Sequence, residues 1–148
     1  YQHRGVIHSR MIALTPRNSW LVIDSLNGKG KHLVESFIHF HPAVRVEIQN
    51  NSAPGGAGTV ATGWAIRFGE HQYFLTSLGS GELVARESWY APEFGLRQRQ
   101  TTLHWTWRGD LPVRLVYAFT PAGEKPPVIS QHSGQEALGI DPAAFASD

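Results

Sequence analysis

The sequence predicts an all-β fold, an antiparallel β-sandwich of about nine or more strands, and three observations lead to it. Apolar residues recur with a period of two along the chain and almost never with the helical period. Clusters rich in Gly, Pro, Asn and Asp separate the alternating segments at short intervals. No helical pattern lies between these segments, which argues against βαβ units and favours two packed antiparallel sheets.

The first four predicted strands are residues 5–14, 19–25, 31–40 and 44–49. The first two flank Thr15-Pro16-Arg17-Asn18, and the third follows the Gly-containing segment 26–30, both of which are typical of turns. In residues 44–49, Val and Ile alternate with Arg, Glu and Gln, so one face of that strand meets a core and the other meets water. The segment 51–58 is rich in Gly and small residues and predicts an exposed loop.

Further segments with the same alternation are residues 59–68, 71–78, 82–89, 97–107 and 112–119. Short connections that contain Gly separate most of them, at 69–70, 79–81 and 109–112. The predicted organisation is one sandwich domain over residues 1–121, followed by a C-terminal tail, 122–148, that packs on the sandwich or frays from it.

Composition excludes several classes of function. Thirteen Lys and Arg against twelve Asp and Glu, without a basic run, give a net charge of +1 and argue against nucleic-acid binding. No apolar run reaches the roughly eighteen residues that a membrane-spanning helix needs, so no membrane insertion is expected. The absence of cysteine removes disulfides, thiolate zinc sites and cysteine nucleophiles. The chain opens at Tyr1 in a strand-like region, which favours a piece of a longer protein.

Three histidines and one aspartate stand on or beside the first three predicted strands, namely His8, Asp24, His39 and His41. If these strands are neighbours, two imidazoles and a carboxylate can meet and form a three-ligand site for Zn²⁺ or a similar divalent ion. No spacing rule enforces this site, because its ligands converge only through tertiary pairing. The alternative is that these histidines are half-buried sheet residues hydrogen-bonded to neighbours and that Asp24 closes a turn.

A second group of candidates lies near residue 105, where Trp105 and Trp107 alternate with His104 and Arg108. This pattern is compatible with an aromatic face that stacks on sugar rings, and also with ordinary packing of Trp in a core. The sequence contains neither a Gly-x-Ser-x-Gly element nor a phosphate-binding loop ahead of a helix, which argues against serine hydrolases and nucleotide-binding enzymes.

Several short motifs, taken together and in order, resemble the C-terminal sandwich domain of heparinase II/III-like polysaccharide lyases. In the first half they are His8-Ser9-Arg10, the segment from Trp20 to Asp24, Gly28, His32, and Phe37-Ile38-His39-Phe40-His41-Pro42. In the second half they are Trp89-Tyr90-Ala91-Pro92-Glu93-Phe94-Gly95, the segment from Leu111 to Tyr117, and Pro121. Each piece alone is short, so the specificity lies in the combination.

The resemblance implies a bacterial, periplasmic or secreted carbon–oxygen lyase. In that family an N-terminal (α/α) toroid precedes the sandwich, and an acidic polysaccharide such as a glycosaminoglycan binds between them. Such enzymes remove the proton beside a uronate carboxyl group and eliminate the 4-linked sugar. Because the toroid normally supplies the catalytic Tyr, this chain alone is expected to be inactive, and the sequence identifies no catalytic residue in it.

The resemblance also implies a divalent metal, Zn²⁺ in the first instance, held by His8, Asp24 and His39. Some of these lyases place a catalytic His two residues before the first metal ligand, where this chain has Val6. Because Val6 cannot transfer a proton, either another imidazole such as His3 takes that role or the role is lost in this chain.

Arg10, His41, Trp105 and Arg108 are the residues expected to contact an acidic glycan. One alternative function is a non-catalytic module that binds such a glycan through Arg10, Trp105, Trp107 and Arg108. Another is a purely structural domain that packs on its partner domain. Elimination of a uronate polymer would distinguish the lyase from both.

Overall fold

The computed structural model describes residues 5–49, 63–127, 129–131 and 138–140, and within these ranges the chain is all-β and contains no helix. The elements in chain order are β1 (Ile7–Leu14), β2 (Trp20–Asn27), β3 (Lys31–His39), β4 (Arg45–Gln49), β5 (Gly63–Phe68), β6 (His71–Leu78), β7 (Glu82–Glu93), β8 (Leu96–Asp110), β9 (Val113–Pro121), β10 (Ile129–Gln131) and β11 (Leu138–Ile140). The first nine strands correspond one to one with the nine predicted segments, which confirms the predicted fold class. The predicted loop 51–58 lies outside the described residues.

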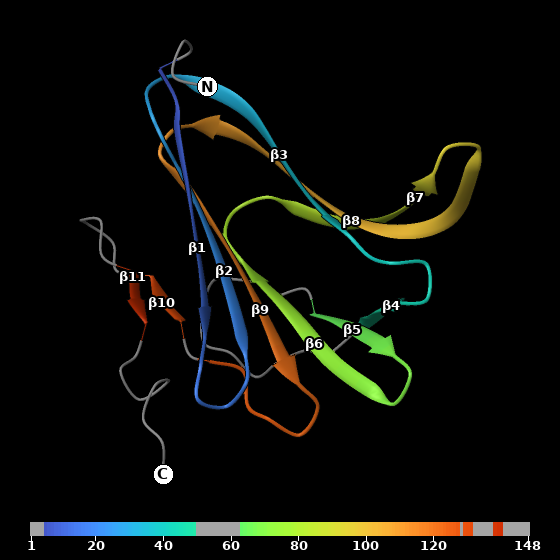
Figure 1. The fold of residues 1–148 in the computed structure, drawn as a ribbon. Coiled ribbons are helices and arrows are strands. Elements are labelled where there is room, and N and C mark those ends of the chain that lie inside the picture. Colours follow the sequence, from blue (N-terminus) through green and yellow to red (C-terminus); the bar gives the residue numbers. More distant parts are fainter. Residues whose placement is uncertain (1–4, 50–62, 128, 132–137, 141–148) are drawn as a thin grey trace.

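Two antiparallel sheets form the two layers of the sandwich (Figure 1). The large sheet has the order β1-β2-β9-β6-β5-β4, and the small sheet has the order β3-β8-β7. The short strands β10 and β11 pair with each other in a separate ribbon within the predicted tail. Consecutive strands along the chain therefore do not always share a sheet, and the chain changes sheets between β2 and β3.

The β1–β2 hairpin sets the position of the later site residues. Its turn is closed by a hydrogen bond from the Thr15 amide to the Ser19 carbonyl (2.9 Å), and Asn18 takes a positive φ of 55° that its side chain tolerates. The resulting register places Arg10 directly opposite Asp24. Residues directly opposite each other share a face of the sheet, so the side chains of Arg10 and Asp24 lie within reach of each other.

Large apolar side chains from both sheets form one core between the layers. From the large sheet come Trp64, Leu75, Leu115 and Tyr117, and from the small sheet Leu103 and Trp105, with Phe40 beside them. Trp105 lies so close to the β6–β7 connection that a Cβ at Gly81, where φ is +132°, would stand 2.5 Å from its Nε1 atom. The tight packing therefore requires glycine at this position.

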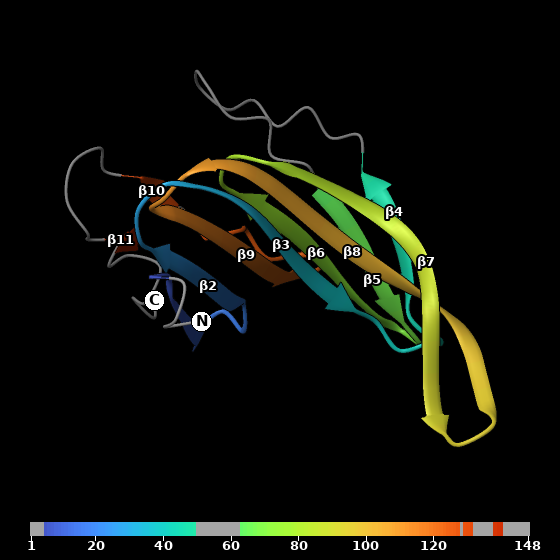
Figure 2. The same ribbon diagram turned by 90° about the horizontal axis from the view of Figure 1, so that it is seen from above.

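The outer part of the β7–β8 hairpin extends beyond the sandwich as a curved arm (Figures 1 and 2). The arm comprises residues 87–101, which lie past the last β3–β8 pair, His39 with Thr102. Both strands of the arm are longer than predicted, because β7 continues to Glu93 and β8 begins at Leu96. The register shifts between Tyr90 and Glu93. Phe94 at the tip is fully exposed. The alternation of side chains predicted the strands but not this projection.

Candidate functional site

A pocket of about 530 Å³ lies between the two sheets where β1 and β2 face β3. Its large-sheet wall carries His8, Arg10 and Asp24, and its small-sheet wall carries Glu35, Ser36 and Phe37. Trp105 and Leu115, which belong to the core, also line it. The pocket thus combines an apolar lining with a few polar side chains, which is the usual character of a ligand site.

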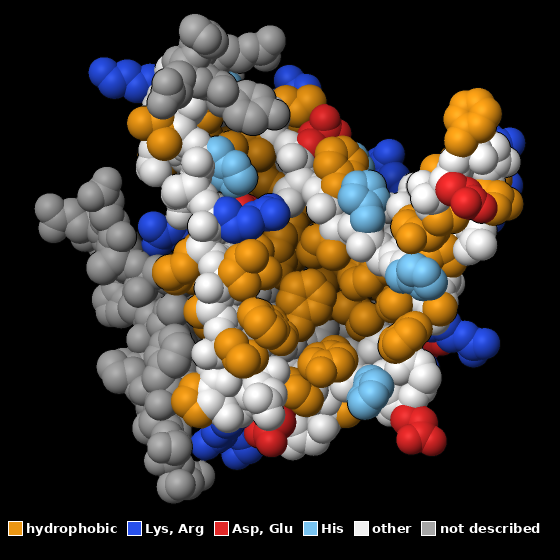
Figure 3. Space-filling model, in the orientation of Figure 1, with side chains coloured by type: hydrophobic (Ala, Val, Ile, Leu, Met, Phe, Trp, Pro, Cys, Tyr) orange, Lys and Arg blue, Asp and Glu red, His pale blue; other side chains and the backbone are white. Residues whose placement is uncertain are grey.

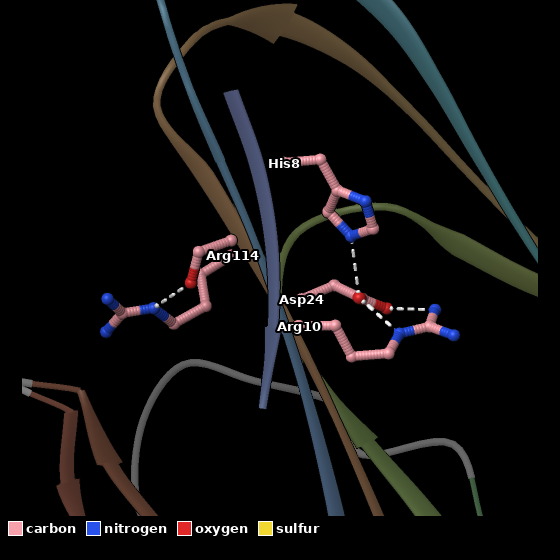
Figure 4. A network of polar contacts seen from close by, with 5 residues as sticks. His8, Arg10, Asp24 and Arg114 are labelled. Carbon is pink, nitrogen blue, oxygen red and sulfur yellow. Dashed lines mark hydrogen bonds and ion pairs between the residues drawn. The ribbon is translucent and has the colours of Figure 1, made fainter. Parts of the chain in front are cut away.

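A buried carboxylate organises the polar side of this pocket. The Asp24 side chain is only 4% exposed, and three hydrogen bonds reach its two oxygens (Figure 4). Arg10 donates from Nε to Oδ1 at 2.7 Å and from Nη2 to Oδ2 at 2.8 Å, while the Nε2 atom of His8 lies 2.8 Å from Oδ1. We place the histidine proton on Nε2 because an ionised carboxylate can only accept.

The electrostatics agree with an ionised Asp24. Burial by itself would raise the pKa of the Asp24 carboxyl, but the hydrogen bonds from Arg10 and His8 and their charges outweigh burial and hold this pKa below its usual value. The hydrogen bond to Asp24 likewise raises the pKa of the Arg10 guanidinium. The bidentate geometry holds that guanidinium in a fixed orientation at the pocket wall.

A buried phenol lies close to this ion pair. Burial raises the pKa of Tyr117 to about 12, and the Ser36 side chain beside it offsets only part of that effect. The Tyr117 hydroxyl is buried and, among the described residues, makes no hydrogen bond of normal geometry. Tyr117 therefore stays neutral at ordinary pH and adds no charge to the site.

The expected metal ligands do not converge. His8 and Asp24 meet, but His39 lies on the small sheet, where its Nδ1 atom is 2.9 Å from Thr102 Oγ1. Within the described ranges no group of three His, Cys, Asp or Glu side chains could hold a metal ion. The physical reason is that β3 pairs with β8 and not with β2. Because Arg10 also engages both Asp24 oxygens, these residues do not fit a resident three-ligand zinc ion, and metal binding by the chain stays a prediction.

The residues expected to contact a glycan are dispersed. Arg10 lies in the pocket, and Trp105 lines it but is only 2% exposed, so its ring packs in the core. His41 follows β3 and contacts Tyr90 edge to face at a centroid distance of 5.3 Å. Arg108 stands opposite Leu33 on the small sheet, is exposed, and does not line the pocket. Val6 lies at the pocket, whereas His3 is outside the described residues.

One polar pair beside the pocket was missed from the sequence. His104 is buried, and its Nε2 atom lies 2.9 Å from Glu35 Oε1, while its ring stacks on Phe37 at a centroid distance of 4.4 Å. The Nδ1 atom of His104 is buried and has no hydrogen-bond partner in the described part of the chain. The pairing of β3 with β8 brings these residues together over a long sequence separation, and no local motif signals it.

Fold and site together define a class, that of two-layer antiparallel sandwich domains with a polar pocket between the sheets. The chain matches the heparinase II/III-like, C-terminal family over residues 1–134, and it belongs to that family. The family expected from the sequence motifs is thereby confirmed. No curated protein matches the chain.

Two solved structures of the heparinase III BT4657 gene product, one with methylated lysines, are similar in fold. Their TM-scores are 0.63 and 0.62 at sequence identities of 13% and 12%. The matches cover 86% and 89% of this chain but only 19% and 21% of theirs. The chain therefore spans about a fifth of the length of these structures. The described residues contain no helical segment capable of spanning a lipid bilayer.

Proposed function

We propose that the chain is the C-terminal sandwich domain of a bacterial heparinase II/III-like lyase that cleaves a uronic-acid polysaccharide, such as a glycosaminoglycan, by β-elimination. The observation that carries this proposal is the family match over residues 1–134. In the reaction, a base removes the proton at C5 of the uronate, a double bond forms between C4 and C5, and the C4–O bond breaks as an acid protonates the departing sugar oxygen. The domain supports the substrate cleft and supplies part of its wall.

Arg10 is the residue of the pocket best suited to an acidic sugar. Its side chain is 48% exposed, and the contacts to Asp24 use Nε and one N–H of Nη2. The remaining N–H donors are available to a carboxylate or sulfate, which a guanidinium binds with defined geometry. Because Asp24 fixes Arg10 beforehand, little side-chain entropy is lost on binding. A cation held beside the uronate carboxylate also makes the neighbouring proton easier to remove.

The remaining parts of the lyase lie outside this chain. We propose an N-terminal (α/α) toroid as the partner that carries the acid and base, and export to the periplasm or the medium, where an acidic polysaccharide is met. The chain alone is expected to bind glycan without cleaving it, because elimination requires the acid, base and cation to be held together. The proposed function needs no divalent ion in this domain, since the described residues of the pocket do not supply three ligands for one.

The experiment measures elimination and binding separately. The complete polypeptide that contains this domain is assayed on heparin, heparan sulfate and alginate by the ultraviolet absorbance of the unsaturated uronate product. Arg10→Met is expected to lower kcat/KM at least tenfold, while Arg114→Met is neutral. Arg114 is a matched control because its Nε donates to Ser25 Oγ at 3.1 Å on the opposite side of the large sheet (Figure 4). Absence of product from all three polymers would contradict the proposed activity.

A second candidate function is non-catalytic binding of an acidic glycan, and one observation favours it. On the arm, Trp89 is 46% exposed, and the guanidinium carbons of Arg97 and Arg99 each lie 4.3 Å from the centroid of its ring. Exposed aromatic rings beside guanidinium groups suit an anionic sugar. Glycan affinity that depends on Trp89, without any elimination by the complete polypeptide, would establish this function in place of the lyase.

A further inference from the structure

The small sheet covers only part of the inner face of the large sheet. Large apolar side chains remain exposed at both ends of that face, on β1–β2 and on β4–β5, which we call its two wings. On the β1–β2 wing, Ile12 is 59% exposed and Trp20 is 47% exposed. Both belong to the inner face, because they stand directly opposite Val22 and Phe119, which pack against the core. Leu14, opposite Trp20, is 49% exposed on the same face.

The other wing shows the same property. Ile48 is 59% exposed and stands opposite Trp64, a core residue, so it also points to the inner face. Phe68 is 52% exposed and follows Trp64 and Ile66 on alternate positions of β5. Figure 3 shows hydrophobic side chains gathered across this hollowed face, with charged ones mainly at its margins. An exposed apolar surface of this extent is typical of an interface.

The chemistry of this face favours polypeptide over polysaccharide. On the side of the Arg10–Asp24 pair that leads to the β1–β2 turn, the inner-face positions of β1, β2, β9, β6, β5 and β4 hold Ile, Leu, Val, Phe, Trp, Tyr, Pro and Ser, together with one histidine, His71. An anionic glycan needs cations and hydrogen-bond donors, and these positions supply neither a Lys nor an Arg. Apolar side chains of another protein segment would bury this surface at no electrostatic cost.

The occupant follows from the length of the related structures. This chain spans only 19% and 21% of the two heparinase III structures that share its fold, so about four fifths of such a chain lies outside the described domain. A sheet must bury its apolar face against another layer, and the small sheet supplies only part of that layer. We propose that the uncovered inner face, with Ile12, Leu14, Trp20, Ile48 and Phe68, is the docking surface for the remainder of the lyase polypeptide, and this inference rests on the proposed function.

The absence of cysteine from the chain makes a direct test simple, because single cysteines can be introduced without a competing thiol in this domain. Ile12→Cys reports on the inner face, and its matched control, Met11→Cys, reports on the opposite face of the same strand, where Met11 is 47% exposed. Ile48→Cys and Glu47→Cys form a second pair on β4, in case one variant fails to fold. Each variant is made in the complete polypeptide, and maleimide labelling of the introduced cysteine is followed by peptide mass mapping.

The expected result is that Ile12→Cys and Ile48→Cys react at least tenfold more slowly than Met11→Cys and Glu47→Cys, in a polypeptide that is monomeric by light scattering. Equal rates within each pair would overturn the proposal. Protection found only in a dimer and lost on dilution would assign the face to a second copy of the chain instead. Inner-face cysteines that react freely and are protected only by added heparin oligosaccharide would assign it to glycan. Protection without any elimination activity would refute the proposed lyase and leave the interface standing.

Discussion

Replacing Arg10 by Met tests the role assigned to the buried carboxylate. Met keeps an apolar side chain of similar reach but removes both charge-assisted hydrogen bonds that Arg10 donates to Asp24. Such bonds contribute about 1.5–3 kcal/mol each in favourable cases. Arg10 is 48% exposed, so water replaces part of this contribution, and His8 remains bonded to Asp24. The expected loss in the free energy of unfolding at pH 7 is about 2–4 kcal/mol, because a buried charge loses most of its partners.

The free energy of unfolding is also expected to depend on pH, in a direction set by the Asp24 carboxyl. The folded-state pKa of Asp24 lies below its usual value of 3.8, so the ionised form stabilises the fold at pH values above 3.8. That contribution is lost as the pH falls through the lower, folded-state pKa. In Arg10→Met the effect of burial is no longer outweighed, so the pKa of Asp24 rises and the loss of stability on acidification begins at a higher pH.

The assay is urea unfolding followed by tryptophan fluorescence, at pH 7 and across the acid range. A loss of 2–4 kcal/mol corresponds to a fall in Tm of roughly 5–15 °C for a chain of this size. Arg114→Met, which removes one hydrogen bond to Ser25, is expected to cost about 1 kcal/mol or less. Adding Asp24→Leu to Arg10→Met should recover stability, because the unpaired charge is gone. Equal effects of the two Arg variants, or a further loss in the double variant, would refute the reasoning.

Three other predictions follow from the described geometry. In urea unfolding, Tyr117→Phe is expected to leave the free energy of unfolding unchanged or to raise it by up to about 1 kcal/mol. The wild type should lose stability as the pH rises from 10 toward the Tyr117 pKa of about 12, and Tyr117→Phe should abolish that loss. In thermal melts with and without Zn²⁺, His39→Ala is expected to respond as the wild type does, since His39 lies apart from Asp24; a response lost in His39→Ala would restore it as a ligand. Gly81→Ala should cost about 3 kcal/mol or more because its Cβ would meet Trp105, whereas Gly95→Ala, with open space around it, should cost only about 1–2 kcal/mol. Equal costs of these two changes in urea unfolding would contradict the packing argument.

The strands were predictable because the period of two is a local property. Each sandwich strand buries one face, and that requirement appears directly in segments such as residues 44–49. The proximity of His8 and Asp24 was also within reach, because the turn at Arg17 makes the first two strands a hairpin. Arg10 and Asp24 lie equally far from that turn, so the register alone points to their ion pair.

The third metal ligand shows where local patterns stop being informative. The expectation for His39 assumed that the third strand lies next to the second, but the chain crosses to the other layer after Gly28, and β3 pairs with β8. The choice between pairing with β2 and pairing with β8 depends on packing across the whole molecule. For the same reason, the contact of Glu35 with His104 could not be derived from the sequence.

The position of β9 in the large sheet has a consequence for synthesis on the ribosome. β9 lies between β2 and β6, so residues 20–26 cannot form their second set of strand pairs until residues 113–119 have been synthesised. Until then the large sheet exists only as two separate pieces, the β1–β2 hairpin and the β4–β6 strands, each with an unpaired edge on the side that β9 later fills. Contacts between such distant segments form slowly, and nascent chains stopped before Val113 would expose both edges to other proteins. The strand β9 is thus the one that joins these two pieces into a single sheet.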